Sequence, residues 1–269
     1  MTELVRREVK GPVATLTFNR PEAFNALDLP TARALADLLL DASSDPAVGV
    51  VVLTGEGRAF SAGGDLRSVM AHPHGPPAAF RELATYVHVC VTEIRRMPKP
   101  VIAAVNGVAA GGGFSLALAC DFRVMAASAR LVQGYTSQAL AIDAGGTFTL
   151  PRLVGMARAL EIAAFDEPIS AEQALAWGLA TRIASDNAVL AEAMEMAATL
   201  AARSTNSFAA VKRLLTDSFD TPFERQLEAE REALIACASH PDGMEGLAAF
   251  VEKRRPVYNA GTAKPGGSA

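Results

Sequence analysis

Apolar and polar positions follow two different periods along this chain, and the change between them divides it into two parts. In the first part, short apolar or alternating runs that end at glycine or proline predict strands. These runs are a β-hairpin over residues 4–21 and single strands at residues 48–57, 101–107, 122–128 and 130–134. Between them, helical spacing predicts helices at residues 31–45 and 78–98, the first capped by Thr31.

The second part of the chain is helical almost throughout. Helical spacing covers residues 145–165 and 170–179, and one last strand is expected at residues 180–184. The remainder, up to Arg255, is predicted to be helical, with breaks near Ser204, Thr221-Pro222 and His240-Pro241.

This order of elements predicts the domain organisation. Strands that alternate with helices indicate an α/β core, which we place at residues 1–195. Helices alone follow at residues 196–258, and their many apolar positions are expected to pack on the core or on another subunit. The tail at residues 259–269 is small and polar, and is expected to be disordered.

Composition narrows the class of protein. The chain has 269 residues, half of them hydrophobic, and a net charge of −4, which argues against a nucleic-acid partner. Its three cysteines are widely spaced and form no CxxC pair, so we expect reduced thiols and a cytoplasmic protein. No apolar run is long enough for a membrane span. His72 and His74 lie in a loop without further ligands, so no metal site is expected.

Two glycine-rich turns carry the candidate chemistry. They lie in "GRAFSAGGDLRSV", residues 57–69, and in "NGVAAGGGFSLALACDF", residues 106–122. Each turn follows an apolar strand and leads into a helix, where backbone N–H groups have no intrahelical partner. Two such turns on neighbouring strands can direct two N–H groups at one oxyanion. Each can equally be a tight connection alone. The spacing fits neither a P-loop nor a dinucleotide fingerprint.

The sequence resembles the crotonase superfamily, also called the enoyl-CoA hydratase/isomerase family. The matching stretches stand in the family's order and cover nearly the whole chain. They are "TFNRPEAFNALD", "VVVLTGEGRAFSAGGDL", "KPVIAAVNGVAAGGGFSLALACDFRVMA", "DAGGTFTLPRLVGMARALEI", "ISAEQALAWGLATRI" and "EGLAAFVEKRRPVY". The resemblance implies a spiral of ββα units, a C-terminal helical trimerisation region, acyl-CoA thioester substrates, and a homotrimer or hexamer.

The resemblance also assigns roles to residues. It implies that the N–H groups of Gly64 and Gly112 hold the thioester oxyanion. Backbone groups of Ala62, Asp65 and Leu66 match positions at the adenine end of coenzyme A, which is part of the substrate, so no separate cofactor is expected. The other implied substrate-binding residues are Phe24, Ala26, Gly111, Ser115 and Tyr135, with Phe250 and Lys253, which often reach the nucleotide from a neighbouring subunit. Glu22 stands where many relatives carry a lysine near coenzyme A.

The family's hydratases use two glutamates, and both are missing here. Ser115 and Tyr135 stand at their positions, and neither side chain replaces a carboxylate base near neutral pH. Asp143 remains, at the position of the catalytic aspartate in several isomerases of the superfamily. A single carboxylate suits isomerisation, because one base can take a proton from the γ-carbon and return it to the α-carbon. The alternative is that Asp143 only caps the helix near Gly145.

We therefore predict an acyl-CoA isomerase with Asp143 as the proton shuttle, and three alternatives stay open. One is a hydratase-like enzyme with reduced hydratase activity. Another is an aryl-CoA dehalogenase or hydrolase with Asp143 as the nucleophile. Its aromatic pocket would draw on Phe24, Phe60, Phe114, Tyr135 and Phe148. The third is a non-catalytic binder of CoA thioesters.

Overall fold

The computed structural model describes residues 3–259, and its chain begins with the expected hairpin. β1 (Val5–Lys10) pairs antiparallel with β2 (Val13–Phe18), with Lys10 opposite Val13 across the turn. The predicted tail lies outside the described residues apart from Asn259. Within the described residues, no helix is both long enough and apolar enough to cross a membrane.

The hairpin forms one edge of a six-stranded sheet. Its order is β1-β2-β3-β5-β7-β10, and every pairing after the first is parallel. The other strands are β3 (Val50–Gly55), β5 (Val101–Val105), β7 (Phe122–Ala126) and β10 (Arg182–Ala184). β3 and β5 are buried along their whole length, and apart from Thr54 and Gly55 at the end of β3 they are apolar, as expected of strands covered on both faces.

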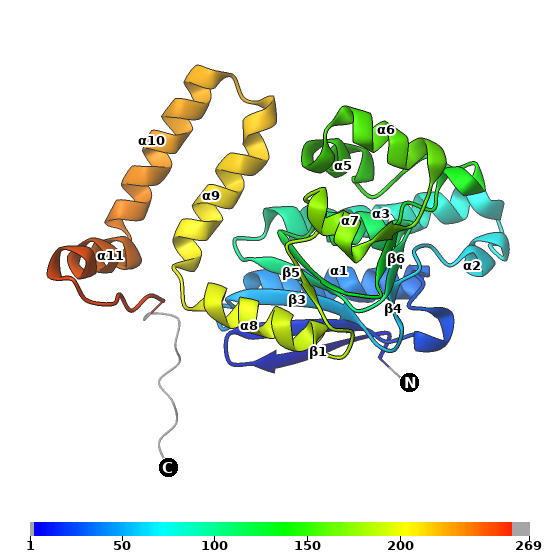
Figure 1. Ribbon diagram of the computed structural model, residues 1–269, viewed down its shortest axis with the longest axis horizontal. Coiled ribbons are helices and arrows are strands. Elements are labelled where there is room, and N and C mark those ends of the chain that lie inside the picture. The colour runs from blue at the N-terminus through cyan, green and yellow to red at the C-terminus, as the bar shows by residue number, and fades with distance from the viewer. Residues whose placement is uncertain (1–2, 260–269) are drawn as a thin grey trace, which may run out of the picture.

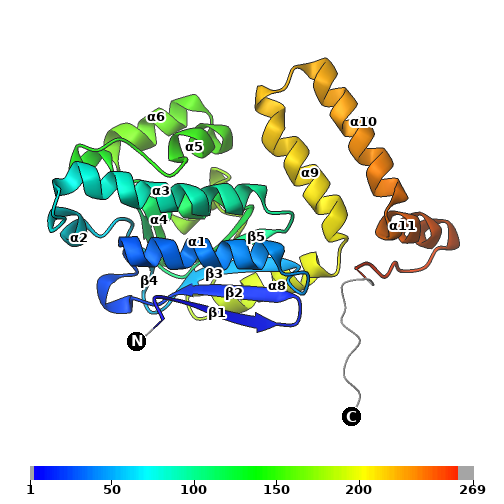
Figure 2. The ribbon, with the colours of Figure 1, turned by 180° about the vertical axis from the view of Figure 1, so that it is seen from behind.

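Helices cover both faces of this sheet. Figure 2 shows α1 (Leu29–Ser44) and α3 (Gly75–Arg96) side by side on one face, and Figure 1 shows α8 (Val189–Ala201) on the other. The sequence places the start of α1 wrongly. Asp28, and not Thr31, caps the helix, and its carboxylate accepts from both the amide (2.9 Å) and the hydroxyl (2.6 Å) of Thr31. A capping carboxylate three residues upstream of Thr31 satisfies the orphan amide better than a residue inside the first turn.

A second sheet of four short strands lies beside the first, in the order β4-β6-β8-β9. The strands are β4 (Ala59–Ser61), β6 (Val108–Ala110), β8 (Arg130–Val132) and β9 (Ile169–Ser170). β4, β6 and β8 each follow a strand of the large sheet after a turn and each lead towards a helix, so the ββα order implied by the resemblance is confirmed. Of these four strands, only β8 is expected from the sequence, within the strand predicted at residues 130–134. The other three are missed, because two or three residues are too few to show a period.

The remaining helices of the core are short. They are η1 (Pro21–Ala23), α2 (Leu66–Met70), α4 (Gly112–Ala119), η2 (Thr136–Gln138), α5 (Gly146–Val154), α6 (Met156–Phe165) and α7 (Ala171–Ala176). α2 and α4 begin directly after the two glycine turns, as the sequence predicts.

The last helices form an arm that stands off the core (Figures 1 and 2). The arm comprises α9 (Thr205–Asp217), η3 (Ser218–Asp220), α10 (Phe223–Ser239) and α11 (Pro241–Glu252), with breaks where the sequence predicts them. The boundary expected after residue 195 falls inside α8, which packs on β3 and β5. The division into a core and an oligomerisation region stays a prediction.

Candidate active site

The two glycine turns meet at one point of the molecule. Leu27 bridges the first turn, since its N–H donates to the oxygen of Gly63 (2.7 Å) and its oxygen accepts from the N–H of Asp65 (2.9 Å). These two hydrogen bonds engage the residues on either side of Gly64, and the N–H of Gly64 itself donates to no acceptor among residues 3–259. Gly112, in the second turn, is the first residue of α4, where an N–H has no intrahelical acceptor. A Cβ on Gly112 would lie only 3.9 Å from the nitrogen of Gly64.

Neighbouring glycines allow this close approach. Gly63 has a φ of 84°, and a Cβ on it would lie 2.6 Å from the oxygen of Ala110 and 2.8 Å from the nitrogen of Gly112. A Cβ on Gly113 would lie 2.3 Å from the oxygen of Ser61. These three distances are shorter than a Cβ atom tolerates, so only glycine at positions 63 and 113 lets the two turns touch. The turns therefore present two adjacent N–H groups, the arrangement of an oxyanion hole.

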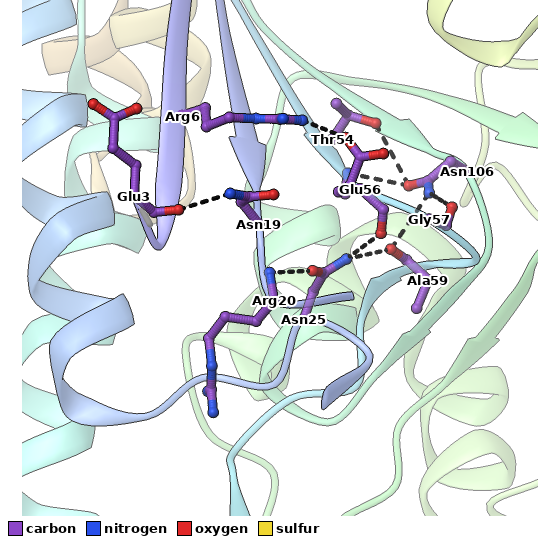
Figure 3. Close-up of polar contacts among 11 residues, drawn as sticks. Glu3, Arg6, Asn19, Arg20, Asn25, Thr54, Glu56, Gly57, Ala59 and Asn106 are labelled. Carbon is purple, nitrogen blue, oxygen red and sulfur yellow. Dashed lines mark hydrogen bonds and ion pairs between the residues drawn. The ribbon is translucent and has the colours of Figure 1, made fainter. Parts of the chain in front are cut away.

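Two asparagines, the buried Asn25 and the partly exposed Asn106, hold the strand ends that carry these turns (Figure 3). The amide of Asn25 donates to the oxygens of Glu56 (3.0 Å) and Ala59 (2.7 Å). Asn106 donates to the oxygen of Gly57 (2.8 Å) and accepts from the N–H of Gly55 (3.1 Å). The asparagine side chains thus supply hydrogen bonds to the backbone where β3 passes into β4 and no strand partner is available. They hold the segment that leads to Gly64 in place.

Asp143 lies in the loop between η2 and α5, and its carboxylate does not cap the helix. The cap position is Gly145, in a left-handed conformation and without a side-chain cap hydrogen bond. Oδ1 of Asp143 instead accepts a hydrogen bond from Nε2 of His88 on α3, at 2.7 Å. About half of each side chain is exposed, 46% for Asp143 and 54% for His88. The carboxylate is therefore oriented by a titratable partner that itself reaches solvent.

Ser115 and Tyr135 support the Asp143 loop. The buried Ser115 donates its hydroxyl proton to the backbone oxygen of Asp143 at 2.8 Å. Burial raises the pKa of Tyr135 to about 12; a hydrogen bond with Ser115 acts against this shift, and the charge of Asp143 adds to it. Tyr135 is thus a neutral phenol at neutral pH. Neither residue supplies a second base.

A cavity of about 510 Å³ brings these groups together. Gly64, Gly112, Tyr135 and Asp143 all line it, while Ser115 lies behind its wall. The rest of the lining is apolar except for Arg81: Leu27, Pro77, Phe80, Leu83, Ala84, Val87, Leu140, Ala141 and Ala144. The size and the few convergent polar groups are those of a small-molecule site.

The predicted coenzyme A positions lie next to Gly64, outside this cavity. Ala62 and Leu66 are exposed on either side of the turn, and Ala62 donates its N–H to the oxygen of Phe24 at 2.9 Å. Asp65 caps α2 through the N–H of Ser68 (3.2 Å) and pairs with Arg20 (3.0 Å). Its backbone N–H is taken by Leu27, so this group is not free for a ligand.

The other predicted substrate positions are placed as follows. Phe24 is half exposed, with the Arg58 guanidinium 4.5 Å from its ring centre, whereas Ala26 is buried. Gly111 donates its N–H to the oxygen of Val132 at 3.1 Å and so holds the second turn to β8. Phe250 is 85% exposed at the end of the arm, and Lys253 follows α11 directly. These two do not reach the cavity of their own chain.

The aromatic pocket of the dehalogenase alternative is mostly absent. Phe60 and Phe114 are fully buried in the core, and Phe148 is stacked against Arg95 and Arg152. Of the five aromatic candidates only Tyr135 lines the cavity. Large aromatic side chains are often buried in the hydrophobic core, and the sequence does not show which of them lie in the core and which line a cavity.

The sequence interpretation misses His88, Phe80 and Arg81. All three lie on α3: Phe80 and Arg81 line the cavity, and His88 lies four residues after the cavity residue Ala84, on the same helix face. That spacing is visible in the sequence. What it faces is not, because α3 pairs with a loop 55 residues further along the chain.

A spiral of ββα units with two backbone N–H groups placed as an oxyanion hole is typical of the crotonase class of enzymes. The family model described as "Enoyl-CoA hydratase/isomerase" matches residues 8–261. The chain belongs to this family, whose members process acyl-CoA thioesters.

Individual relatives differ in the reaction they are named for. The chain is 36% identical over 259 residues to 1,2-epoxyphenylacetyl-CoA isomerase of Escherichia coli K12, covering 96% of this chain and 99% of the relative. It is 37% identical over 245 residues to 4-chlorobenzoyl coenzyme A dehalogenase-2 of an Arthrobacter species, covering 90% and 88%. The crystal structure of an enoyl-CoA hydratase from Polaromonas sp. JS666 superposes with a TM-score of 0.90 at 39% identity, covering 95% and 99%.

Proposed function

We propose that this protein is an acyl-CoA isomerase that moves a double bond through a thioester enolate. One observation carries the proposal: a single carboxylate, Asp143, shares a cavity with the N–H groups of Gly64 and Gly112. The positions of the two hydratase glutamates hold Ser115 and Tyr135, which bear no carboxylate. The relative named as an isomerase supports the same reaction class.

The proposed reaction uses the groups in order. Asp143 removes a proton from the γ-carbon of the acyl chain. The thioester oxygen gains negative charge, and the N–H groups of Gly64 and Gly112 stabilise it. Asp143 then returns a proton to the α-carbon, so no second acid is needed. The reaction needs no metal and no cofactor besides the coenzyme A of the substrate.

His88 gives this cycle a route to solvent. Nε2 of His88 contacts the carboxylate of Asp143, the group that would carry the proton, and the imidazole ring is half exposed. An imidazole in such a position can pass a proton between Asp143 and water. We therefore expect part of the transferred protons to exchange with solvent during turnover.

The test is a screen of unsaturated acyl-CoA thioesters in D₂O, read by mass spectrometry for a shifted double bond and for deuterium uptake. Asp143→Asn keeps the size of the side chain but removes its basicity. It should lower both readouts by about 10²-fold or more, the scale of general acid–base catalysis, with the thermal melting temperature unchanged. Full activity in Asp143→Asn would contradict the proposal.

A second candidate is hydrolytic, with Asp143 as the nucleophile. In this reaction the carboxylate of Asp143 attacks the aromatic carbon that bears the halogen, halide leaves, and water hydrolyses the resulting aryl ester of Asp143. The contact with His88 favours this candidate, because an imidazole beside the ester is placed to activate the water. The relative named as a dehalogenase supports this reaction class. A single turnover with an aryl-CoA would then leave added mass on the peptide that contains Asp143, whereas an isomerase would leave none.

A further inference from the structure

One wall of the cavity is a loop, residues 133–145, that joins β8 to α5; we call it the wall loop. Its cavity residues are Tyr135, Leu140, Ala141, Asp143 and Ala144. Two alanines of the loop have a left-handed backbone, Ala139 with a φ of 56° and Ala144 with a φ of 54°. Residues with a side chain adopt this conformation at a cost, so contacts from outside the loop must hold it in place.

The first turn of the wall loop is held by a carboxylate at the end of α6. Oδ1 of Asp166 accepts from the N–H of Gly134 at 2.8 Å, and Oδ2 accepts from the N–H of Ser137 at 3.3 Å. Hydrogen bonds from N–H groups to a carboxylate are about twice as strong as those between neutral groups. Both oxygens of one side chain thus fix two backbone positions of the loop.

The backbone of Asp166 gives its side chain this direction. Asp166 follows α6 directly with a φ of 52°, and its N–H donates to the oxygen of Ile162 at 3.1 Å. Aspartate is among the residues that tolerate a left-handed conformation, because its short polar side chain bonds to nearby backbone groups. The same residue therefore ends the helix and reaches back to the wall loop.

The two amides that Asp166 holds lie beside the candidate active site. A Cβ on Gly134 would lie 3.3 Å from the nitrogen of Gly111, the residue before Gly112 of the oxyanion hole. Tyr135, the next residue of the loop, lines the cavity, whereas Asp166 lies outside the cavity lining. Asp166 thus acts on the site through the backbone of the wall loop.

We propose that Asp166 is a positioning residue, whose carboxylate holds the wall loop against the second glycine turn and so keeps the cavity in the shape that binds the acyl part of the thioester. This proposal rests on the proposed function, because it takes the cavity as the acyl site. Displacement of a positioning element by about 1 Å is enough to lower the activity of an enzyme by two orders of magnitude.

Two variants of the full-length protein separate this role from the stability of α6. Asp166→Gly removes the carboxylate, and glycine adopts a φ of 52° without strain, so the end of the helix is kept. Asp166→Asn keeps the size of the side chain but has one acceptor oxygen in place of two. The control is Asp186→Ala: Asp186 accepts from the N–H of Ser128 at 2.9 Å, in the turn between β7 and β8, and neither residue lines the cavity.

Two measurements need no turnover. Hydrogen–deuterium exchange, read by mass spectrometry on the peptide that covers the wall loop, should be at least about tenfold faster in Asp166→Gly, the effect of one lost hydrogen bond to a charged group. Calorimetric titration should show about tenfold weaker binding of butyryl-CoA, a saturated thioester, with unchanged binding of free coenzyme A and an unchanged melting temperature. Asp166→Asn should lie between Asp166→Gly and the unmodified protein in both measurements, and Asp186→Ala should match the unmodified protein.

Unchanged exchange of the wall loop in Asp166→Gly would overturn the proposal. So would an equal loss of affinity for butyryl-CoA and free coenzyme A together with a lower melting temperature, which would show that Asp166 only stabilises the fold. Equal affinity of the unmodified protein for the two ligands would overturn both this inference and the proposed function. The expected exchange and affinities, together with inactive turnover of every unsaturated thioester, would support this inference and contradict the proposed isomerase function alone.

Discussion

At the scale of single residues, the three consecutive glycines at the start of α4 have three different tasks. Gly111 adopts a φ of 51°, which favours glycine over other residues. Gly113 packs against Ser61 too closely for any side chain. Of the three, Gly112 alone lines the cavity, and its Cβ position has ordinary space, with Leu27 as the nearest neighbour at 3.5 Å. These tasks can be separated by mutation.

Gly112→Pro replaces the backbone N–H by a ring carbon. Gly112 is the first residue of its helix, the position where proline is best tolerated. We expect turnover to fall by about 10²–10³-fold, as for loss of one oxyanion-hole donor, while the melting temperature stays close to that of the unmodified protein. Gly112→Ala keeps the N–H and is the control. A loss in Gly112→Ala as large as in Gly112→Pro would mean that space, and not the N–H, limits the reaction.

Two buried thiols make stability depend on alkaline pH. Burial raises the pKa of Cys90 and of Cys120 from 9.0 to about 12. The folded chain then keeps thiol protons that the unfolded chain releases, so the stabilisation is complete below about pH 9 and is lost as the pH rises towards 12. Urea unfolding at several pH values should show this fall, and Cys120→Ala should make it shallower. An equally steep fall in Cys120→Ala would contradict the assignment.

At the scale of elements, one buried lysine fastens the arm to the core. Nζ of Lys212, on α9, donates to the oxygen of Ile94 (2.7 Å), to the oxygen of Lys99 (3.1 Å) and to Oδ2 of Asp121 (2.7 Å). Burial raises the pKa of Asp121, and the charge of Lys212 acts against that shift. The pair therefore joins α9 to the end of α3 and to the residue that precedes β7.

Lys212→Met should destabilise the protein strongly, because it leaves the carboxylate of Asp121 buried without its cation. Removing one partner of a buried pair costs about 3–5 kcal/mol, which urea unfolding would measure. Arg213→Met is the control: it is the next residue on the same helix and is exposed. A similar free energy of unfolding in the two variants would show that the pair does not anchor the arm.

At the scale of the whole molecule, the arm exposes an extensive apolar surface. Its large exposed side chains include Leu215, Phe219, Phe223, Leu234, Leu247 and Phe250. Apolar surface of this extent on an isolated arm favours association. Phe250, on α11, and Lys253, directly after it, are predicted to contact coenzyme A but do not line the cavity of their own chain.

We expect the full chain to form a trimer or a hexamer, and a chain that ends after residue 203 to be monomeric. The shortened chain keeps α8, which covers the sheet, and loses the arm. Light scattering at micromolar concentration measures both states. A monomeric full-length protein would contradict the prediction, as would a shortened chain that still forms trimers.

The sequence by itself determined the alternation of strands and helices, the breaks between the last helices and the two glycine turns. These features depend on neighbours a few residues apart, so their periods and residue types are visible along the chain. Even the cap of α1 is local, but two acceptable caps stood close together, and only the backbone geometry distinguished Asp28 from Thr31.

Only the tertiary structure decided what faces Asp143. The contact with His88, the place of Arg81 on the same cavity wall and the burial of Phe60 and Phe114 each depend on how α3, α4 and the loop before α5 pack. A hydrogen bond between residues 55 positions apart leaves no period in the sequence, because side-chain direction is fixed by the packing of whole elements.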